Sequence, residues 1–510
     1  MKKLLFLILG ILIILIAVLL IRTFTYPFKK NSSGTKSGWK AMKNDSAVQR
    51  FSGGLKIPTV STGELGNFDY SPFETFKEYL RNSYPLVYQN TENYEINKYG
   101  LVFRLKGNNP NLEPILFLSH IDVVPPGDAD IKNSRENVFI PNDKPLSPIT
   151  KVAADWDFGP FSGAVANGRI YGRGAIDMKG MLFSLMESMN NLIKSGYTPQ
   201  RDIYLAFGFD EEVGGAKGAA QIAVHFKKQG LKFEAVYDEG GLILEKGSVK
   251  GINSDVAVIG CAEKGFLSAK IKVKGLGGHS SMPPLETAMG KAAIIMQRLE
   301  DDQMKPIMTP LIKQFFDNVG GTMPFVNRLA IANQWFLKPV LLSQLTKNNS
   351  TNALVRTTTA LTMMKGSDGP NVLSPEVEFI VNFRLLPGNT VKDVKDHIAK
   401  ATEGFDVEIE EIDNTKEASA VSSTHTKSFT IIEVGIKEIY PDAIATPYLT
   451  IAATDAYKYQ IVSKNIYRFM PIKINDAERQ SIHSTNEYLS IENYMKMIHY
   501  FEYIMKNYDQ

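Results

Sequence analysis

The sequence predicts an α/β protein in which a mixed-sheet main domain is interrupted by an inserted α+β domain and preceded by one apolar helix. From about Phe51, short apolar runs alternate with helix-like segments, which is typical of α/β sheets. From Phe266 the runs alternate apolar and polar residues, as half-exposed strands do. We therefore expect a membrane segment (1–22), a tether (23–52), a main domain (53–263 and 416–510) and an insertion (264–415).

Composition narrows the class of protein. The chain has 510 residues, 44% hydrophobic and 22% charged, which is ordinary for a globular protein of two or more domains. A net charge of +3, without a long basic run, argues against a nucleic-acid partner. The single cysteine, Cys261, excludes an intramolecular disulfide and a multi-cysteine zinc site.

The N-terminus reads as a membrane anchor. Leu4 to Ile21 is apolar apart from one glycine and spans roughly 27 Å as a helix, near the bilayer core of about 30 Å. No small-residue cleavage site follows Arg22, which favours an uncleaved anchor over a signal peptide. Lys2 and Lys3 favour a cytoplasmic N-terminus, although basic residues also follow the segment. We expect the body of the protein outside the cytoplasm.

A run of three acids follows the most apolar strand of the main domain. Ile203 to Phe209 is short, aromatic and partly β-branched, and Asp210, Glu211 and Glu212 come directly after it. The carboxyl ends of strands are where open α/β sheets bind ligands. Taken alone, the run is more typical of a solvated acidic turn.

Three other strand ends or glycine turns carry similar side chains. His120 ends the strand from Ile115, with Asp122 placed to orient its imidazole; Asp177 lies in a glycine-rich turn; Asp238 ends the strand from Phe233. Individually they read as a structural histidine, a helix N-cap and a strand-end acid. In order along one α/β pattern they predict a site for divalent cations, with His483 as the best further ligand downstream.

The ordered motifs resemble a known family. LSHIDVVP, GRGAIDMKG, DEEVGG, DEGG, GLGGHSSMPP, NFRLLPG and IHSTNE are similar to motifs of the dinuclear zinc family of aminoacylase, carboxypeptidase S and glutamate carboxypeptidase. RTTTALT, NVLSPE and IYRFMPI most resemble the branch of carboxypeptidase S and the N-fatty-acyl-amino-acid synthase/hydrolases. The resemblance covers roughly residues 50 to 510. It implies a zinc aminopeptidase-like catalytic domain that cleaves the amide bond of a peptide or N-acyl amino acid next to a free carboxylate.

The resemblance also implies a role for each residue. Each subunit would hold two Zn²⁺ ions, or other divalent cations, with Asp177 bridging them. His120 and Asp238 would complete the coordination of one ion, and Glu212 and His483 that of the other. Glu211 would be the general base for a water shared by the two ions, and would pass the proton to the leaving amine.

The insertion is expected to be a ferredoxin-like lid and dimerisation domain. Its strands and helices follow the order βαββαβ. The resemblance implies that His279 polarises the scissile carbonyl, reaching it from a partner subunit of a homodimer. It implies that Arg384 clamps the substrate carboxylate and that Asn371 contacts substrate.

Two stretches depart from the family pattern. Tyr457 stands where the family usually has an arginine, which leaves a substrate contact missing or relocated. Residues 301–350 carry many apolar side chains, including Phe315, Phe316 and Trp335. Such stripes are usually helix core. The alternative is a groove for a hydrophobic acyl group.

Three other functions remain open. A catalytically silent receptor on the same fold would be expected to have lost ligands or base, and none is missing. An aminopeptidase would need an acidic group for the substrate ammonium, whereas Arg384 suits a carboxylate. Condensation of a fatty acid with an amino acid is the same reaction in reverse. Serine or nucleotide chemistry is disfavoured, because the sequence has neither a GxSxG elbow nor a phosphate-binding lysine loop.

Overall fold

The computed structural model describes residues 1–29, 37–40, 44–62, 69–126, 156–249 and 251–509. The chain divides into a larger unit (30–261, 422–447 and 454–510) and a smaller unit (1–29, 262–421 and 448–453). The chain enters and leaves the insertion at 261/262 and 421/422, against the predicted 263/264 and 415/416. The N-terminal segment joins the smaller unit, which the sequence did not indicate. Part of the expected tether lies outside the described residues.

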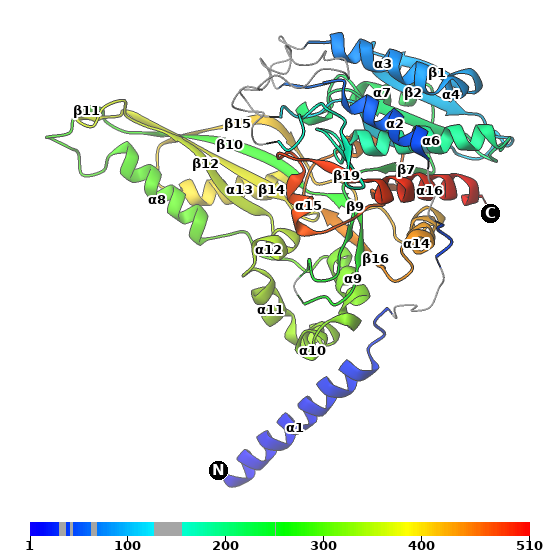
Figure 1. Cartoon of the computed structure of the whole chain (residues 1–510). Coiled ribbons are helices and arrows are strands. Elements are labelled where there is room, and N and C mark those ends of the chain that lie inside the picture. The colour runs from blue at the N-terminus through cyan, green and yellow to red at the C-terminus, as the bar shows by residue number, and fades with distance from the viewer. Residues whose placement is uncertain (30–36, 41–43, 63–68, 127–155, 250, 510) are drawn as a thin grey trace. The chain divides into compact units, whose positions relative to one another are not determined.

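A ten-stranded mixed sheet forms the centre of the larger unit (Figure 1). Its order is β1-β2-β6-β3-β7-β17-β9-β8-β18, with β16 also pairing with β9. Four neighbouring strands, β6, β3, β7 and β17, run parallel. The bounds are β1 Glu92–Ile96, β2 Gly100–Leu105, β3 Ile115–His120, β6 Ile203–Gly208, β7 Ala235–Asp238, β8 Ile243–Leu244, β9 Val256–Glu263, β16 Ile444–Thr450, β17 Ile466–Arg468 and β18 Lys473–Ile474.

Both faces of this sheet are covered by helices. Leu116, Leu118 and Ala206 pack on one face against α7 (Ala219–Lys228) and η5 (Asp455–Ile461). Phe117 faces the other way and lies 5.9 Å from the ring of Phe501 in α16. The strands are therefore apolar at successive positions instead of alternating. The other elements of this unit are α2 Asp45–Leu55, α3 Ser71–Ser83, α4 Pro85–Asn90, β4 Val165–Ala166, β5 Arg169–Tyr171, α6 Lys179–Lys194, η3 Glu211–Val213, α14 Lys427–Ile439, α15 Asp476–Ser481, β19 Tyr488–Ser490 and α16 Ile491–Asn507.

The smaller unit contains an antiparallel sheet of order β12-β14-β10-β15. Its strands are β10 Gly265–Lys274, β12 Thr358–Lys365, β14 Glu376–Leu385 and β15 Val407–Lys416, and α8 (Ala288–Asp301) and α13 (Val391–Thr402) pack on it. Alternate residues such as Leu267, Ala269 and Ile271 are buried in the core between the sheet and helices. The elements follow the predicted βαββαβ order. At the end distant from the chain crossings, β11 (Gly278–His279) pairs with β13 (Val372–Leu373).

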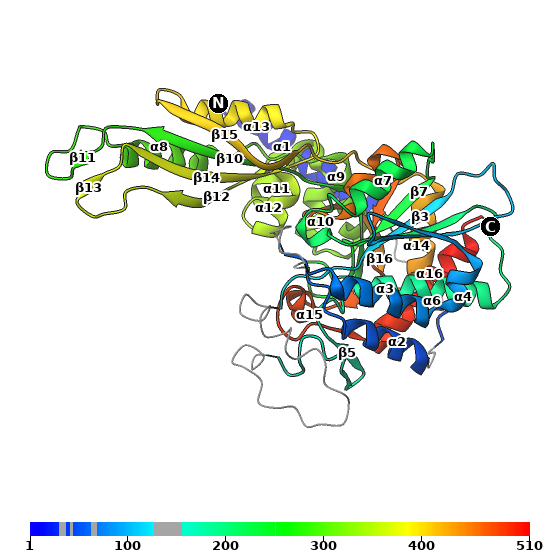
Figure 2. The same ribbon diagram turned by 90° about the horizontal axis from the view of Figure 1, so that it is seen from above.

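Between α8 and β12 the chain forms further helices: α9 Pro310–Val319, η4 Gly320–Thr322, α10 Phe325–Ala332, α11 Gln334–Leu345 and α12 Asn349–Val355. Phe315 and Phe316 are buried, each 5% exposed, whereas Trp335 and Phe336 are exposed. The apolar stripe is therefore only partly helix core. N-terminal helix α1 (Lys2–Thr25) reaches this bundle and is the only described helix long and apolar enough to cross a membrane or to be a signal sequence. Figure 2 shows the bundle and the sheet from above.

Candidate metal centre

Three parallel strands bring their carboxyl ends to the same edge of the larger unit's sheet. His120 is the last residue of β3 and lies opposite Gly208, the last residue of β6. Strand β7 runs on the other side of β3 and ends at Asp238. The polar residues that end or follow these strands are thus neighbours in space.

The first group of potential ligands consists of His120, Asp177 and Glu239, whose donor atoms lie within 4.8 Å of one another. His120 Nε2 is 3.1 Å from Asp177 Oδ1 and 3.4 Å from Glu239 Oε1. The His120 side chain is 1% exposed and that of Glu239 12%. One imidazole and two carboxylates at this spacing suit a divalent cation.

The second group shares Asp177 with the first and adds Glu212 and His483. His483 Nε2 is 2.9 Å from Asp177 Oδ2 and 3.4 Å from Glu212 Oε2. The two oxygens of one carboxylate therefore face two different histidines. His483 adopts a left-handed backbone conformation with a φ of 61°, a strained state for a residue with a side chain.

Glu211 lies beside the groups but belongs to neither. Its Oε2 is 4.0 Å from His120 Nε2, and its side chain is 14% exposed. Burial raises the pKa of Glu211 well above its usual value, with the carboxylates of Asp455 and Glu239 contributing. A carboxylate whose pKa is raised is a stronger base than an exposed glutamate, as proton transfer to and from a substrate requires.

Asp122 organises the start of the acidic turn. Its Oδ1 accepts the backbone N–H of Glu211 and its Oδ2 that of Glu212, both at 3.1 Å. His120 Nδ1 lies 2.9 Å from the Asp122 carbonyl oxygen and 3.3 Å from its Oδ1. Asp122 is fully buried and therefore orients the imidazole and both glutamates at once.

The acidic turn itself is a short 3₁₀ helix, η3. Asp210 does not join either ligand group; its carboxylate accepts the N–H groups of Lys217 and Gly218. Gly215 has a φ of 65°, and a Cβ there would lie 2.1 Å from Asp455 Oδ1. The turn therefore closes on Asp455 only because glycine occupies this position.

The electrostatics of the two groups indicate whether cations could bind between their side chains. Burial raises the pKa of Glu239 well above its usual value and also raises that of Glu212, and in both cases the Asp177 carboxylate adds to the effect. Hydrogen bonds to Asp177 and Glu212 raise the pKa of His483 to about 10. No described residue donates a hydrogen bond to the buried Glu212 Oε1. Crowded carboxylates, with one buried oxygen lacking a donor, fit a cation among them.

Glu239 is a member of the first group that sequence reasoning did not name. The sequence placed Asp238 in the first group, but Asp238 Oδ2 accepts the backbone N–H of Ala456 at 2.8 Å. Glu239, the residue after the end of β7, is the acid that joins His120 and Asp177 in the first group. Both residues stand in the DEGG motif, and residue type alone does not distinguish them.

Glu487 is a second residue that sequence reasoning missed. Its fully buried carboxylate pairs with Arg173 at 2.7 Å and accepts the N–H groups of Gly174, Ile176 and Asp177. It thereby holds the turn that carries Asp177. Glu487 lies in the IHSTNE motif, four residues after His483, and this position is the sequence feature that could have identified it.

The remaining predicted residues lie in the smaller unit. His279 in β11 is opposite Val372, and the N–H of Ser280 bonds the carbonyl oxygen of Asn371 at 3.1 Å, so His279 and Asn371 are neighbours. Arg384 in β14 is instead opposite Phe266 at the start of β10.

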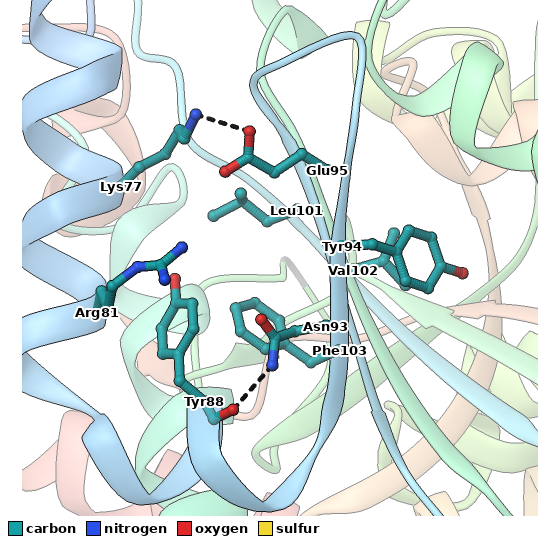
Figure 3. A pocket seen from close by; sticks show the side chains of 9 residues that line it. All are labelled: Lys77, Arg81, Tyr88, Asn93, Tyr94, Glu95, Leu101, Val102 and Phe103. Atoms are coloured by element: carbon teal, nitrogen blue, oxygen red, sulfur yellow. Dashed lines mark hydrogen bonds and ion pairs between the residues drawn. The ribbon is translucent and has the colours of Figure 1, made fainter.

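A small pocket of the larger unit is distinct from the metal groups. It lies between α3 and the hairpin of β1 and β2 (Figure 3). Two of its side chains form polar contacts: Lys77 pairs with Glu95 at 2.8 Å, and Asn93 donates to the Tyr88 carbonyl oxygen at 2.9 Å. None of its lining residues is a member of a ligand group.

Comparison with known proteins identifies the family. The model of "Peptidase family M20/M25/M40" matches residues 116–507, which include every residue of the two ligand groups. The chain belongs to this family of M20 peptidases. The resemblance inferred from the motifs and the predicted α/β fold are thus confirmed.

Two curated relatives of this M20 peptidase match most of its length. It is 35% identical over 463 residues to a probable carboxypeptidase S-like 2 of Dictyostelium discoideum, covering 90% of this chain and 84% of the relative. It is 32% identical over 507 residues to the N-fatty-acyl-amino acid synthase/hydrolase PM20D1 of Xenopus tropicalis, covering 98% and 93%. The M20 peptidase is therefore a metal-dependent hydrolase.

Solved structures agree at the level of the fold. A metallo-carboxypeptidase of the M20 family from Sulfolobus solfataricus superposes with a TM-score of 0.63 at 18% identity, covering 92% of this chain and 99% of the other. Human carnosine dipeptidase 1 gives a TM-score of 0.57 at 15% identity, covering 91% and 96%.

Proposed function

We propose that this M20 peptidase is a two-zinc amidohydrolase that cleaves the amide bond of an N-acyl amino acid or peptide next to a free carboxylate. One observation carries the proposal. The two oxygens of Asp177 face His120 at 3.1 Å and His483 at 2.9 Å, so a single carboxylate belongs to both ligand groups. A carboxylate shared by two cations about 3.5–4 Å apart is a standard arrangement for hydrolysis.

The ligand sets follow from the two groups. His120, Asp177 and Glu239 would hold one ion, and Asp177, Glu212 and His483 the other. Mixed imidazole and carboxylate donors suit zinc. Bound there, two cations supply a polarised carbonyl and a water of lowered pKa.

Glu211 is the base in this scheme. It stands next to the ligands without being one, and its raised pKa lets it take the proton of the attacking water. The same carboxyl group then donates that proton to the leaving amine nitrogen, because amide cleavage requires a protonated leaving group. Asp122 keeps Glu211 in place through the backbone.

Arg384 supports the preference for a free carboxylate. Its guanidinium lies 4.7 Å from the centre of the Phe266 ring, and burial lowers its pKa. No described carboxylate forms an ion pair with it. A half-buried, unmatched guanidinium is suited to bind an incoming carboxylate through two hydrogen bonds.

His279 and Arg384 would serve different active sites. Arg384 lies opposite Phe266, while His279 follows the far end of β10 at Lys274. Eight residues of strand separate these ends by about 26 Å, too far for one substrate to contact both. We infer that the enzyme is a homodimer in which His279 and Asn371 complete the partner subunit's site.

The helix α1 is proposed to remain as an anchor, with the enzyme body outside the cytoplasm. Its 24 residues span about 36 Å, enough to cross a bilayer core. Protease added to intact cells should then digest the body, whereas a cytoplasmic body would survive until the cells are opened.

A substrate panel tests the proposed reaction. The full-length enzyme in detergent is assayed with N-fatty-acyl amino acids, short N-acyl amino acids, dipeptides and the carboxyl-amidated form of each. We expect cleavage of free acids, loss of activity with chelator and recovery with Zn²⁺. Binding of a substrate without turnover would indicate a catalytically silent receptor. Equal cleavage of the amidated forms would contradict the proposal that Arg384 binds the substrate carboxylate. Incubating a fatty acid with an amino acid measures the reverse reaction.

A further inference from the structure

Two helices of the smaller unit expose an unusual amount of apolar surface. In α10, Phe325 is 39% and Val326 71% exposed; in α11, Trp335 is 58%, Phe336 47% and Val340 56% exposed. We call these five residues the platform. The 12-residue helix α11 contains one charged residue, Lys338. A water-facing helix normally presents a polar stripe, which α11 lacks.

The platform is fixed to the end of α1. Asn333, between α10 and α11, is fully buried, and its Nδ2 donates to the Leu19 carbonyl oxygen at 3.0 Å and to Thr23 Oγ1 at 3.1 Å. The rings of Phe24 and Phe325 are 5.9 Å apart. Figure 1 shows α1 ending beside α10.

A second set of contacts continues this joint past the end of α1. The hydroxyl of Tyr26 donates to Asp317 Oδ1 in α9 at 2.6 Å, and Lys313 Nζ lies 3.2 Å from the same hydroxyl. A Cβ on Gly320 would lie 2.4 Å from the Phe28 ring. Residues 19–28 and the helices α9 and α10 therefore form one packed joint.

The position of the joint along α1 sets its depth in a bilayer. A hydrocarbon core of about 30 Å takes about 20 helical residues, which from Leu4 reach Thr23. The contacts at Leu19, Thr23 and Phe24 therefore lie at the outer edge of the core. The platform is attached at that level, where tryptophan and phenylalanine partition favourably and a lysine such as Lys338 can extend its charge to the headgroups.

We propose that the platform is a membrane-docking surface and that its partner is the outer leaflet of the bilayer crossed by α1. The helices α10 and α11 lie in the interface and seat the smaller unit on the membrane beside its own anchor. This inference rests on α1 staying in the bilayer, but not on the metal centre or the substrate. It explains why an extended apolar surface directly adjoins a membrane-spanning helix.

A pair of labelled variants tests the proposal. Val326→Cys and Met363→Cys introduce one thiol each at positions 71% and 66% exposed in the same unit, and the native Cys261 is fully buried. Each full-length variant carries an environment-sensitive dye and is placed in phosphatidylcholine nanodiscs. We expect blue-shifted emission at position 326, quenched by lipids with nitroxides high on the acyl chain, and neither effect at 363 on the edge strand β12.

Equal, water-like emission at both positions would overturn the proposal. A shift at 326 that appears only with two or more chains in a disc would assign the surface to a second copy and would also overturn it. Native tryptophans give an independent measurement without labelling. Brominated lipids should quench part of the wild-type emission, and Trp335→Phe should remove that part while Trp39→Phe retains it. Equal quenching of wild type and Trp335→Phe would contradict docking.

Discussion

Glu487 accepts the backbone N–H of Asp177 at 3.1 Å, across 310 residues of sequence. The same carboxylate neutralises Arg173, which is 1% exposed, and binds two further N–H groups of the Asp177 turn. The carboxylate common to both groups is therefore held by a residue that belongs to neither group. Glu487 is a positioning residue for the metal centre.

Replacing Glu487 with Gln should weaken metal binding about 10- to 100-fold, the usual effect of losing a group that orients a ligand. The amide retains the size of the side chain but loses the charge that Arg173 needs. The measurement is a competition titration of Zn²⁺ against a chelator. Glu492→Gln is the matched control, because Glu492 on α16 is 71% exposed and pairs only with Lys496 in the described structure. Unchanged zinc affinity in Glu487→Gln would contradict the assignment.

The neighbours Asp238 and Glu239 should respond differently to loss of charge. We expect Glu239→Gln to purify with about one tightly held zinc per chain instead of two, because the first group loses a charged donor. Asp238→Asn should keep both ions, since its oxygen can still accept the Ala456 N–H. Elemental analysis of the two proteins decides between the acids. Retention of zinc by Glu239→Gln with loss from Asp238→Asn would restore the assignment made from sequence.

Glu211→Gln separates catalysis from metal binding. The variant should keep both zinc ions and lose about 10²- to 10⁴-fold in kcat, the range attributed to a general base. Metal content and kcat are measured on the same preparation. A Glu211→Gln enzyme of near-normal kcat would show that another group moves the proton.

Lys264 should make the stability of the enzyme depend on pH. Burial and the nearby Arg384 lower its pKa to about 7, and its Nζ donates to the Ala353 and Arg356 carbonyl oxygens. Because the unfolded chain keeps this proton up to about pH 10.4, it binds more protons than the folded chain between these values. The contribution of Lys264 to stability should therefore rise with pH, by at most about 1.4 kcal/mol per unit.

The comparison with Lys264→Met isolates this effect. The free energy of unfolding of the wild type minus that of the variant, measured with denaturant at pH 7 and pH 9, should increase by about 1–2 kcal/mol. A difference independent of pH would mean that Lys264 stays charged when buried.

Complementation tests whether His279 acts across a dimer. His279→Ala and Glu211→Gln are coexpressed with different tags, and the doubly tagged dimer is purified. If His279 serves the partner, one of the two sites is intact and activity should recover to about half of wild type in a symmetric dimer. If it serves its own subunit, both sites are defective and the doubly tagged dimer stays inactive.

Much of this architecture could be predicted from local patterns. The buried strands before His120 and Asp210 are short apolar runs bounded by polar residues, and the glycine turn around Asp177 is equally visible. The division of the apolar residues of the insertion into buried and exposed ones was harder to predict from the sequence. Phe315 and Phe316 are core, while Trp335 and Phe336 are exposed, although all four occur in similarly apolar stretches. Burial depends on which helix packs beside each residue, and the local sequence pattern does not specify that packing.

The sequence by itself determined the order of strands and helices, the strand ends that carry acids and histidines, and the apolar N-terminal helix. These follow from periodicity, turn residues and side-chain chemistry, which are local properties. Only the tertiary structure decided that Glu239 lies beside His120, that Glu487 holds Asp177, and that Asn333 binds the end of α1. Each is a contact between distant segments, set by the direction of one side chain and the packing of elements far apart in the chain.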